Sequence, residues 1–304
     1  MSQFWEKARH ADRRPFLEGR SKILRAVRDW FHAQGFTEAE PNVLTLSPGA
    51  ETHVDAFAVE SGYLHTSPEF AMKKLLAAGE EKIFYLGKCW RRGERGPLHA
   101  EEFTMLEWYR AGAPYAAVMD DCIEIVRVAA RTAGADALRW RNKSCDPFKA
   151  AERLSVREAF DQLAPIVMPQ DGDAFSAALV QHVEPNLGDG ALTLLIEYPI
   201  REAALARPCP HDPSVAERFE MYACGMELAN GFGELTDPIE QRRRLIEAMD
   251  EKEKRYGQRW PIDEDFLAAL AHMPPASGVA LGFDRLVMLA TGARHISDVL
   301  WTPT

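Results

Sequence analysis

Residues 89–109 read CWRRGERGPLHAEEFTMLEWY, and this stretch decides the fold. A strand pattern ends near Arg91, a Gly/Pro loop rich in charge follows, and a second strand pattern runs from Phe103 to Tyr109. Two such patterns joined by one loop predict a β-hairpin. Glu107 lies between apolar neighbours on the returning strand, where a buried acid is costly unless a cation or a hydrogen-bond donor meets it.

The two strands of this hairpin are expected to present one shared surface, because side chains alternate between the faces of a strand. The leading strand, residues 83–91, brings Arg91 to this surface, and the returning strand brings Phe103, Glu107 and Tyr109. A guanidinium group binds phosphate or carboxylate, and a carboxylate binds an amine, so the surface suits a charged small molecule. A structural salt bridge between Arg91 and Glu107 is the alternative.

The composition limits the class of protein. The chain has 304 residues, of which 46% are hydrophobic and 27% charged, as in a soluble globular protein. No apolar run reaches the roughly 20 residues of a membrane span, and the first residues lack the apolar core of a signal peptide, so we expect a cytoplasmic protein without membrane association. A net charge of −10 argues against a protein whose main task is to bind a nucleic-acid backbone. Five scattered cysteines without a CxxC pair exclude a zinc site and a disulfide framework.

Apolar periodicity around the hairpin predicts further helices and strands, without repeats or a linker. We therefore expect one domain of the α+β class, residues 1–304, with a mainly antiparallel sheet and with residues 1–14 as an N-terminal extension. Helices are expected at residues 15–35, 68–78, 115–134, 155–163, 173–182, 238–256, 264–271 and 284–291. Extended segments are expected at residues 36–46, 193–197 and 217–228, the last one bending at Gly225, and at 278–283.

A second candidate site lies in residues 217–234, which read ERFEMYACGMELANGFGE. Glu220 and Glu227 stand seven residues apart in it, and Asn230 and Glu234 follow in a glycine-broken segment. Two carboxylates near a phosphate-binding surface suit Mg²⁺, a hard ion that prefers oxygen ligands. Surface acids on a pair of strands are the alternative.

A third candidate site is residues 277–285, SGVALGFDR, a glycine-rich strand that leads into a helix. Glycines let a backbone approach a ligand closely, and Arg285 would then point at phosphate. Tight packing of a helix on a sheet is the alternative.

The order and spacing of these stretches resemble the signature motifs of class II aminoacyl-tRNA synthetases, specifically the lysyl branch. Residues 35–41 (GFTEAEP) resemble motif 1, residues 90–103 resemble motif 2, and residues 278–285 resemble motif 3. Residues 66–69 (TSPE) and 230–237 (NGFGELTD) resemble two further segments of the lysyl branch. The resemblance covers nearly the whole chain. It implies a class II synthetase-like catalytic domain and a homodimer built at motif 1.

The resemblance implies a role for each residue that would bind ATP. Arg91 would bridge the α-phosphate and the carboxylate of the amino acid, and would stabilise charge as the adenylate forms. Phe103 would stack on adenine, while Arg285 and His99 would reach the outer phosphates. Gly93 stands where the family has the acid of motif 2, and the neighbouring Glu94 is the candidate replacement.

The resemblance also implies a magnesium site and a pocket that reads a diamine. Glu220 and Glu227 would hold Mg²⁺. Glu69 would take an ammonium group near the carboxylate end of the substrate, and Glu234 would take the distal ammonium group. The other expected pocket residues are Glu107, Tyr109, Asn230 and Ala280.

Two departures narrow the resemblance to one branch. Residues 1–14 alone precede the first expected catalytic helix, where lysyl-tRNA synthetases carry an anticodon-binding domain, and Ala280 stands where synthetases have glycine. Both features resemble the elongation factor P–lysine ligase family. A methyl group at Ala280 would alter which lysine isomer fits, since a change of one methylene is worth roughly 1–3 kcal/mol.

The function implied is ATP-dependent and Mg²⁺-dependent activation of lysine or (R)-β-lysine as aminoacyl-AMP, followed by transfer to a lysine side chain of elongation factor P. A stand-alone synthetase that charges tRNA or another carrier is one alternative, which the negative charge and the missing domain disfavour. A non-catalytic, amino-acid-binding regulatory paralogue is the other. Retention of Arg91, Glu220, Glu227 and Arg285 argues against it.

Overall fold

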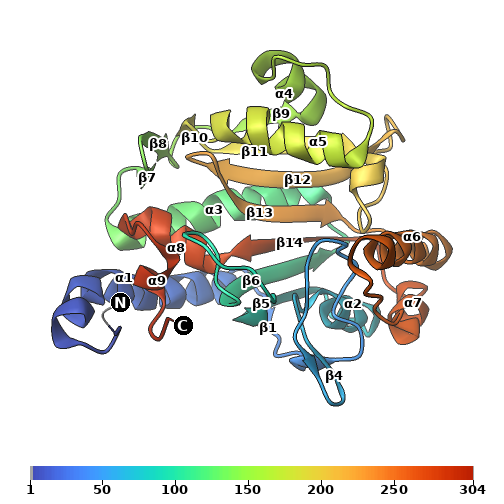
Figure 1. Cartoon of the computed structure of the whole chain (residues 1–304), viewed down its shortest axis with the longest axis horizontal. Coiled ribbons are helices and arrows are strands. Elements are labelled where there is room, and N and C mark those ends of the chain that lie inside the picture. Colours follow the sequence, from blue (N-terminus) through green and yellow to red (C-terminus); the bar gives the residue numbers. More distant parts are fainter. Residues whose placement is uncertain (1–2, 304) are drawn as a thin grey trace.

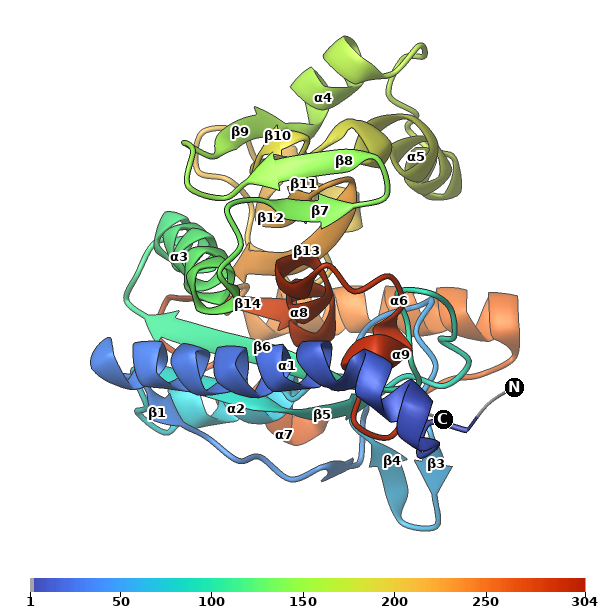
Figure 2. The same ribbon diagram turned by 90° about the vertical axis from the view of Figure 1, so that its left-hand side faces the viewer.

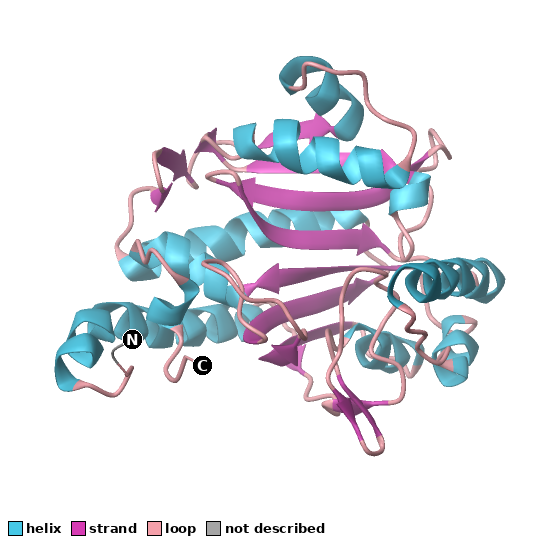
Figure 3. Cartoon of the chain, viewed as in Figure 1, coloured by secondary structure: helices cyan, strands magenta, loops and turns pink. Residues whose placement is uncertain are grey.

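The structure is a computed structural model that describes residues 3–303, with helices on both faces of a large sheet (Figures 1 and 3). The strands of this sheet are, in spatial order, β1 (Thr37–Glu38), β5 (Lys82–Trp90), β6 (Glu102–Ala111), β14 (Ala276–Gly282), β13 (Met226–Gly233), β12 (Val215–Ala223), β11 (Thr193–Pro199) and β9 (Glu152–Ser155). Two smaller sheets consist of β2 (Leu44–Thr45), β4 (Gly62–Leu64) and β3 (Ala58–Val59), and of β10 (Gly190–Ala191), β8 (Lys143–Asp146) and β7 (Leu138–Trp140). The α-helices are α1 (Lys7–Ala33), α2 (Glu69–Ala77), α3 (Tyr115–Ala133), α4 (Val156–Leu163), α5 (Gly172–Ala178), α6 (Pro238–Tyr256), α7 (Glu264–Leu270), α8 (Phe283–Thr291) and α9 (Ile296–Val299). Single helical turns of π or 3₁₀ type are η1 (Leu179–Val183), η2 (Glu184–Asn186) and η3 (Ile200–Glu202).

The large sheet is antiparallel through its middle and parallel only where the edge strands β1 and β9 join it. The predicted α+β class with a mainly antiparallel sheet is therefore confirmed. Strands from both ends of the chain share this sheet, and the expectation of one domain for residues 1–304 stays a prediction. No helix in the part of the chain that the structure describes is both long and apolar enough to cross a membrane.

The hairpin predicted from residues 83–109 is formed by β5 and β6. Its register pairs Tyr85 with Glu107 and Cys89 with Phe103, so the two predicted faces coincide. The opposite face carries buried apolar side chains, namely Phe84, Leu86, Leu106 and Trp108. These side chains pack in the main core with residues of α1, α3 and α8, and α1 itself runs alongside α3, α8 and α9 (Figure 2).

Helix α1 begins earlier than the predicted residue 15. Residues 7–14, expected as part of an extension, are helical, and Pro15 lies inside the helix. A proline in the first turn is favourable, whereas one inside a helix removes a hydrogen bond. The helix continues through Pro15 because its earlier turns pack against the C-terminal part of the chain, where the buried Arg13 donates to the carbonyl oxygen of Leu300.

The predicted single strand at residues 217–228 is wrong, because the chain reverses there as the hairpin of β12 and β13. Cys224 and Gly225 have φ angles of 57° and 71°, the left-handed values that a two-residue hairpin turn requires. Glycine adopts such a φ without strain, and Cys224 is held in it by burial in the main core. Glu220 and Glu227 consequently lie on neighbouring strands.

The remaining predictions differ from the structure mainly at element ends. Helix α6 matches its predicted range, whereas α5 ends at Ala178 and continues as the π turn η1. The sequence pattern does not predict β3, β4, β7, β8, β9 or β10, because each has only two to four residues and shows no sustained alternation. All five cysteines are free and buried, as expected for small core residues.

A buried ion pair ties α1 to the start of α8. The Arg20 guanidinium group contacts the Asp284 carboxylate and donates to the Thr104 hydroxyl group at 2.7 Å. The Thr104 backbone N–H donates to the other oxygen of Asp284 at 2.7 Å. Because Thr104 follows Phe103 and Asp284 precedes Arg285, this triad sets the position of β6 relative to α8.

Replacing Arg20 with methionine is expected to lower the free energy of unfolding by about 3–5 kcal/mol, since it leaves a buried carboxylate without its cation. Urea denaturation measures this change. Arg14→Met is the matched control, because the Arg14–Glu18 pair has side chains 60% and 51% exposed and should contribute less than about 1 kcal/mol. Equal, small losses in both variants would contradict the role given to Arg20.

Candidate active site

A cavity of about 1210 Å³ opens on the face of the large sheet that carries Glu107. Ordinary ligand pockets measure roughly 300–1,000 Å³, so this one has room for two ligands. Its floor consists of β6, β14 and β13. Its walls include the loop of residues 44–54, the loop of residues 91–100, the start of α2 and the first turn of α8.

A row of side chains runs along this floor and continues onto the neighbouring strand β12. Register pairs Glu107 of β6 with Ala280 of β14, Ala280 with Asn230 of β13, and Asn230 with Glu220 of β12. A second row, two residues along each strand, holds Tyr109, Gly278, Phe232 and Arg218. Side chains in register on alternate positions share one face, so the sheet brings residues of all three candidate sites together.

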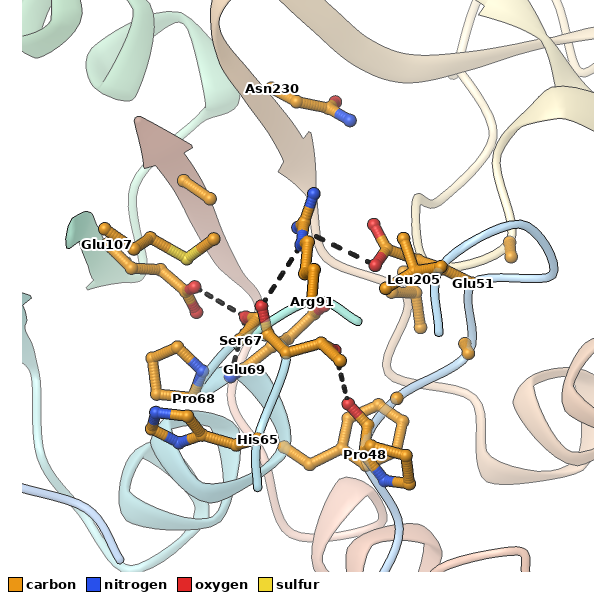
Figure 4. A pocket seen from close by; sticks show the side chains of 18 of the residues that line it. Pro48, Glu51, His65, Ser67, Pro68, Glu69, Arg91, Glu107, Leu205 and Asn230 are labelled. Atoms are coloured by element: carbon orange, nitrogen blue, oxygen red, sulfur yellow. Dashed lines mark hydrogen bonds and ion pairs between the residues drawn. The ribbon is translucent and has the colours of Figure 1, made fainter. Parts of the chain in front are cut away.

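Glu107 is held by hydrogen-bond donors. The Ser67 hydroxyl group donates to one of its oxygens at 2.7 Å (Figure 4). The Tyr109 hydroxyl group donates to the other oxygen at 2.7 Å. Burial, with the negative charge of Glu69 as the next cause, raises the pKa of Glu107 to about 8. Glu107 is therefore mostly protonated at pH 7, and a cation that binds beside it would favour its ionised form.

Two further carboxylates near Glu107, those of Glu69 and Glu234, contact the ammonium group of Lys73. Lys73 Nζ lies 2.6 Å from Glu69 Oε1 and 2.6 Å from Glu234 Oε2. Burial raises the pKa of Glu234, and the Lys73 charge opposes this rise. With Glu107, this gives three carboxylates and one ammonium group at one end of the cavity, which we call the acidic end.

Arg91 projects into the cavity from the start of the charged loop (Figure 4). Its nearest carboxylates among the described residues are Glu51 at 3.7 Å and Glu94 at 3.8 Å, so the alternative salt bridge with Glu107 is not formed. Its guanidinium carbon lies 5.3 Å from the centre of the Phe103 ring. Glu94 thus lies beside Arg91, and its role as the replacement for the acid missing at Gly93 stays a prediction.

Arg285 joins α8 to the charged loop and to β13. Its Nη2 lies 2.6 Å from His99 Nε2, and its Nη1 donates to the Glu227 carbonyl oxygen at 2.9 Å. Burial, followed by the charges of Arg285 and Arg91, lowers the pKa of His99 to about 4. His99 is therefore neutral at pH 7 and accepts a hydrogen bond from Arg285. We call the region of Arg91, Arg285 and His99 the basic end.

The predicted magnesium pair lies next to the basic end. Glu220 accepts hydrogen bonds from Tyr198 at 2.6 Å, Tyr222 at 2.5 Å and Arg218 at 2.6 Å, which leaves one of about four lone-pair positions on its carboxylate. Burial raises the pKa of Glu227, and the negative charge of Glu220 adds to this rise.

These two carboxylates fit Mg²⁺, because the ion relieves the repulsion between them. Within residues 3–303, no three histidine, cysteine or acidic side chains are arranged to hold a metal ion by themselves. Mg²⁺ commonly takes one or two carboxylates and completes its shell with water and phosphate oxygens, so a pair suffices.

Four residues that shape the site were not predicted from the sequence to do so. Ser67 lies in the TSPE segment but received no role, and Lys73 follows Glu69 by four residues on one helix, a spacing that signals contact. No feature of the sequence indicated that Glu51 would lie beside Arg91. A Cβ atom at Gly278 would lie 2.3 Å from the Tyr109 ring and 2.6 Å from Glu234 Oε1, so this glycine permits the close approach of the pocket's own side chains.

Comparison with known proteins extends these observations to the whole chain. A family model described as tRNA synthetases class II (D, K and N) matches residues 2–304. The chain is 37% identical to an elongation factor P–(R)-β-lysine ligase of Pseudoalteromonas translucida, over 93% of this chain and 94% of that protein. It is 38% identical to the ligase of the same name from Vibrio cholerae, over 94% of both chains. A third ligase of this name, from Hamiltonella defensa, is 36% identical over 93% of both chains.

Replacing Glu107 with glutamine is expected to change how stability depends on pH. The folded-state pKa of Glu107, about 8, lies above its ordinary value of 4.5, so the folded protein binds the extra proton and its stability falls as pH rises between these values. From pH 5 to pH 8 the native protein should lose about 3 kcal/mol more of its free energy of unfolding than Glu107→Gln does. Urea denaturation at both pH values measures this. Parallel losses in the two proteins would show that Glu107 is already ionised at pH 5.

Proposed function

Because the chain belongs to the class II tRNA synthetases and, within them, to the elongation factor P–lysine ligases, we propose that it activates lysine or (R)-β-lysine with ATP and transfers it to a lysine side chain of elongation factor P. As a member of this family the chain is a ligase. The observation that carries the proposal is the pairing of an acidic end and a basic end in one cavity of about 1210 Å³. A diamino acid carries two ammonium groups and one carboxylate, and the two ends match these charges.

We place the amino groups of the substrate at the acidic end. Glu69 takes the ammonium group nearer the carboxylate, and Glu234 takes the distal one. Asn230 supports this placement, because its side-chain oxygen is buried and has no hydrogen-bond partner among the described residues. Glu107, kept in place by Ser67 and Tyr109, gains its full negative charge when an ammonium group arrives.

We place ATP at the basic end, with adenine against Phe103. A carboxylate oxygen of the amino acid attacks the α-phosphorus of ATP, the bond from this phosphorus to the bridging oxygen breaks, and pyrophosphate leaves. Arg91 contacts the carboxylate and the α-phosphate, and it compensates the charge that develops on the phosphoryl oxygens. Its ion pairs at 3.7 and 3.8 Å are longer than a hydrogen bond, so phosphate oxygens can replace them.

The outer phosphates would contact Arg285 and His99. Arg285 is already oriented by its bond to the Glu227 carbonyl oxygen, so little side-chain entropy is lost on binding. Glu220 and Glu227 would hold Mg²⁺, which supplies positive charge to the phosphate oxygens when it is bound.

The second step joins the activated amino acid to its protein acceptor. The amine of the acceptor lysine attacks the carbonyl carbon of aminoacyl-AMP, the bond from this carbon to the AMP oxygen breaks, and a proton leaves the nitrogen as the amide forms. ATP and elongation factor P both place this reaction in the cytoplasm. The homodimer that motif 1 implies, through residues 35–41, is part of the same proposal.

The choice between lysine isomers is proposed to depend on Ala280, which lies between Glu107 and Asn230 in the floor of the cavity. Its methyl group narrows the space beside the carboxylate end, where α-lysine and β-lysine differ in the position of one amino group. Moving that group by one carbon changes binding by roughly 1–3 kcal/mol.

The test incubates the protein with ATP, Mg²⁺, purified elongation factor P and either (R)-β-lysine or α-lysine, and then measures the intact mass of the factor. A gain of one lysyl residue is expected. Formation of lysyl-tRNA without any gain in the mass of the factor would favour the tRNA-charging alternative. No lysine-dependent exchange of pyrophosphate into ATP with any isomer would favour a non-catalytic paralogue.

Replacing Glu234 with alanine is expected to lower the rate of lysine-dependent pyrophosphate exchange at least about 100-fold, because a buried ammonium group would lose its carboxylate. The matched control is Glu264→Ala. Glu264 is an exposed residue of α7 that pairs with Arg242 of α6, so its loss should leave the rate unchanged. Exchange at the native rate in Glu234→Ala would refute the role of Glu234.

A further inference from the structure

We propose that Lys73 is a built-in counter-cation that sets the charge of the substrate pocket, so that the acidic end accepts two ammonium groups. This inference rests on the proposed function and deepens it, because it names the residue that sets how many ammonium groups the pocket accepts. Lys73 acts through Glu69 and Glu234, so it is a positioning residue.

The position of Lys73 supports this role. Its ammonium group contacts Glu69 and Glu234 at 2.6 Å each, and its side chain is 0% exposed. Glu69 and Glu234 line the cavity, whereas Lys73 lies behind them on α2. Lys73 therefore does not occupy the place of a ligand, and its charge reaches the ligand only through the two carboxylates.

The charge count at the acidic end explains why a lysine is needed there. Glu69, Glu107 and Glu234 carry three negative charges when ionised, and Lys73 carries one positive charge. Two negative charges remain, which equals the number of ammonium groups in a diamino acid. Without Lys73 a third unmatched charge would stay in a site of low dielectric constant, where it is costly.

A purely structural ion pair would need only one carboxylate. Lys73 instead faces two, and the Glu69 side chain remains 18% exposed to the cavity. Burial raises the pKa of Glu234, and the positive charge of Lys73 opposes this rise, so the lysine favours the ionised form that a ligand would meet. The charged and titratable groups that face Glu234 are Lys73 and Glu69 from α2, Tyr109 from β6, and Arg207 from the segment before β12.

The test replaces Lys73 with methionine and measures lysine-dependent pyrophosphate exchange as a function of pH. Substrate binding requires ionised carboxylates, so kcat/KM for lysine rises with pH along an acid limb. Loss of a positive charge raises the pKa of the carboxylates, and this limb should move to higher pH by about one unit or more. At pH 7.5, KM for lysine should rise at least about 10-fold, while KM for ATP should change by less than about 3-fold.

The matched control is Lys74→Met on the same helix, whose ammonium group contacts Asp263 and Asp265. It changes the same residue type and the same charge, and it should leave the acid limb in place. A merely structural role for Lys73 would lower the amount of folded enzyme but would move neither the limb nor the ratio of the two KM values. An unmoved limb in Lys73→Met would overturn the proposal.

A double variant keeps the proposal falsifiable if Lys73→Met does not fold. Lys73→Met combined with Glu69→Gln restores the net charge of the acidic end to two negative charges, so its carboxylates repel one another less than in Lys73→Met alone. Its KM for lysine should be raised by the loss of Glu69, but its acid limb should return to the native pH. A limb that stays displaced in the double variant would contradict charge matching.

Failure of the proposed function can be told apart from failure of this inference. If the native protein shows no exchange with any lysine isomer, the activation step is refuted. The binding of L-lysine to the same variants is then measured by calorimetry across the pH range. Weaker binding in Lys73→Met with a displaced pH dependence would still support the role of Lys73, and unchanged binding would overturn it.

Discussion

The alternation of β6 is the constraint on which the other features of this protein depend. Trp108 and Glu107 are neighbours, so the pleat sends one into the main core and the other into the cavity. A shift of one residue in register would bury the carboxylate in the apolar core and expose the indole, which makes the register strongly specified. The register of β6 therefore determines both the packing of Trp108 in the core and the position of Glu107 at the acidic end.

The cavity separates opposite charges that would otherwise neutralise each other. Arg91 is paired loosely with Glu51 and Glu94, while Glu107 is satisfied by hydroxyl groups and Glu234 by Lys73. Each buried charge thus has a partner that a ligand can replace or supplement. Such an arrangement stabilises the folded state less than apolar packing would, and it retains electrostatic free energy for binding.

Local patterns in the sequence predicted much of this site, and long-range pairing explains most of what they missed. Alternation alone predicts which side chains share a face on β5 and on β6, including Glu107, and the register of the hairpin makes these two faces coincide. The row from Glu107 through Ala280 to Asn230 joins strands far apart in the chain, and no local periodicity encodes their register. The resemblance to known motifs supplied these residues, but only the structure shows them side by side. Lys73 was missed because a lysine on an amphipathic helix is ordinarily solvated.

The ion pair between Arg20 and Asp284 also bears on the order in which the protein is made. These residues are 264 positions apart in the sequence. Synthesis proceeds from the N-terminus at about 5–20 residues per second, so α1 leaves the ribosome well before α8 exists. Until then Arg20 lacks its carboxylate, and Arg285 is not yet part of the chain. A nascent chain can therefore form the hairpin that carries Glu107 early, but Glu234 joins the acidic end, and Arg285 the nucleotide site, only late in translation.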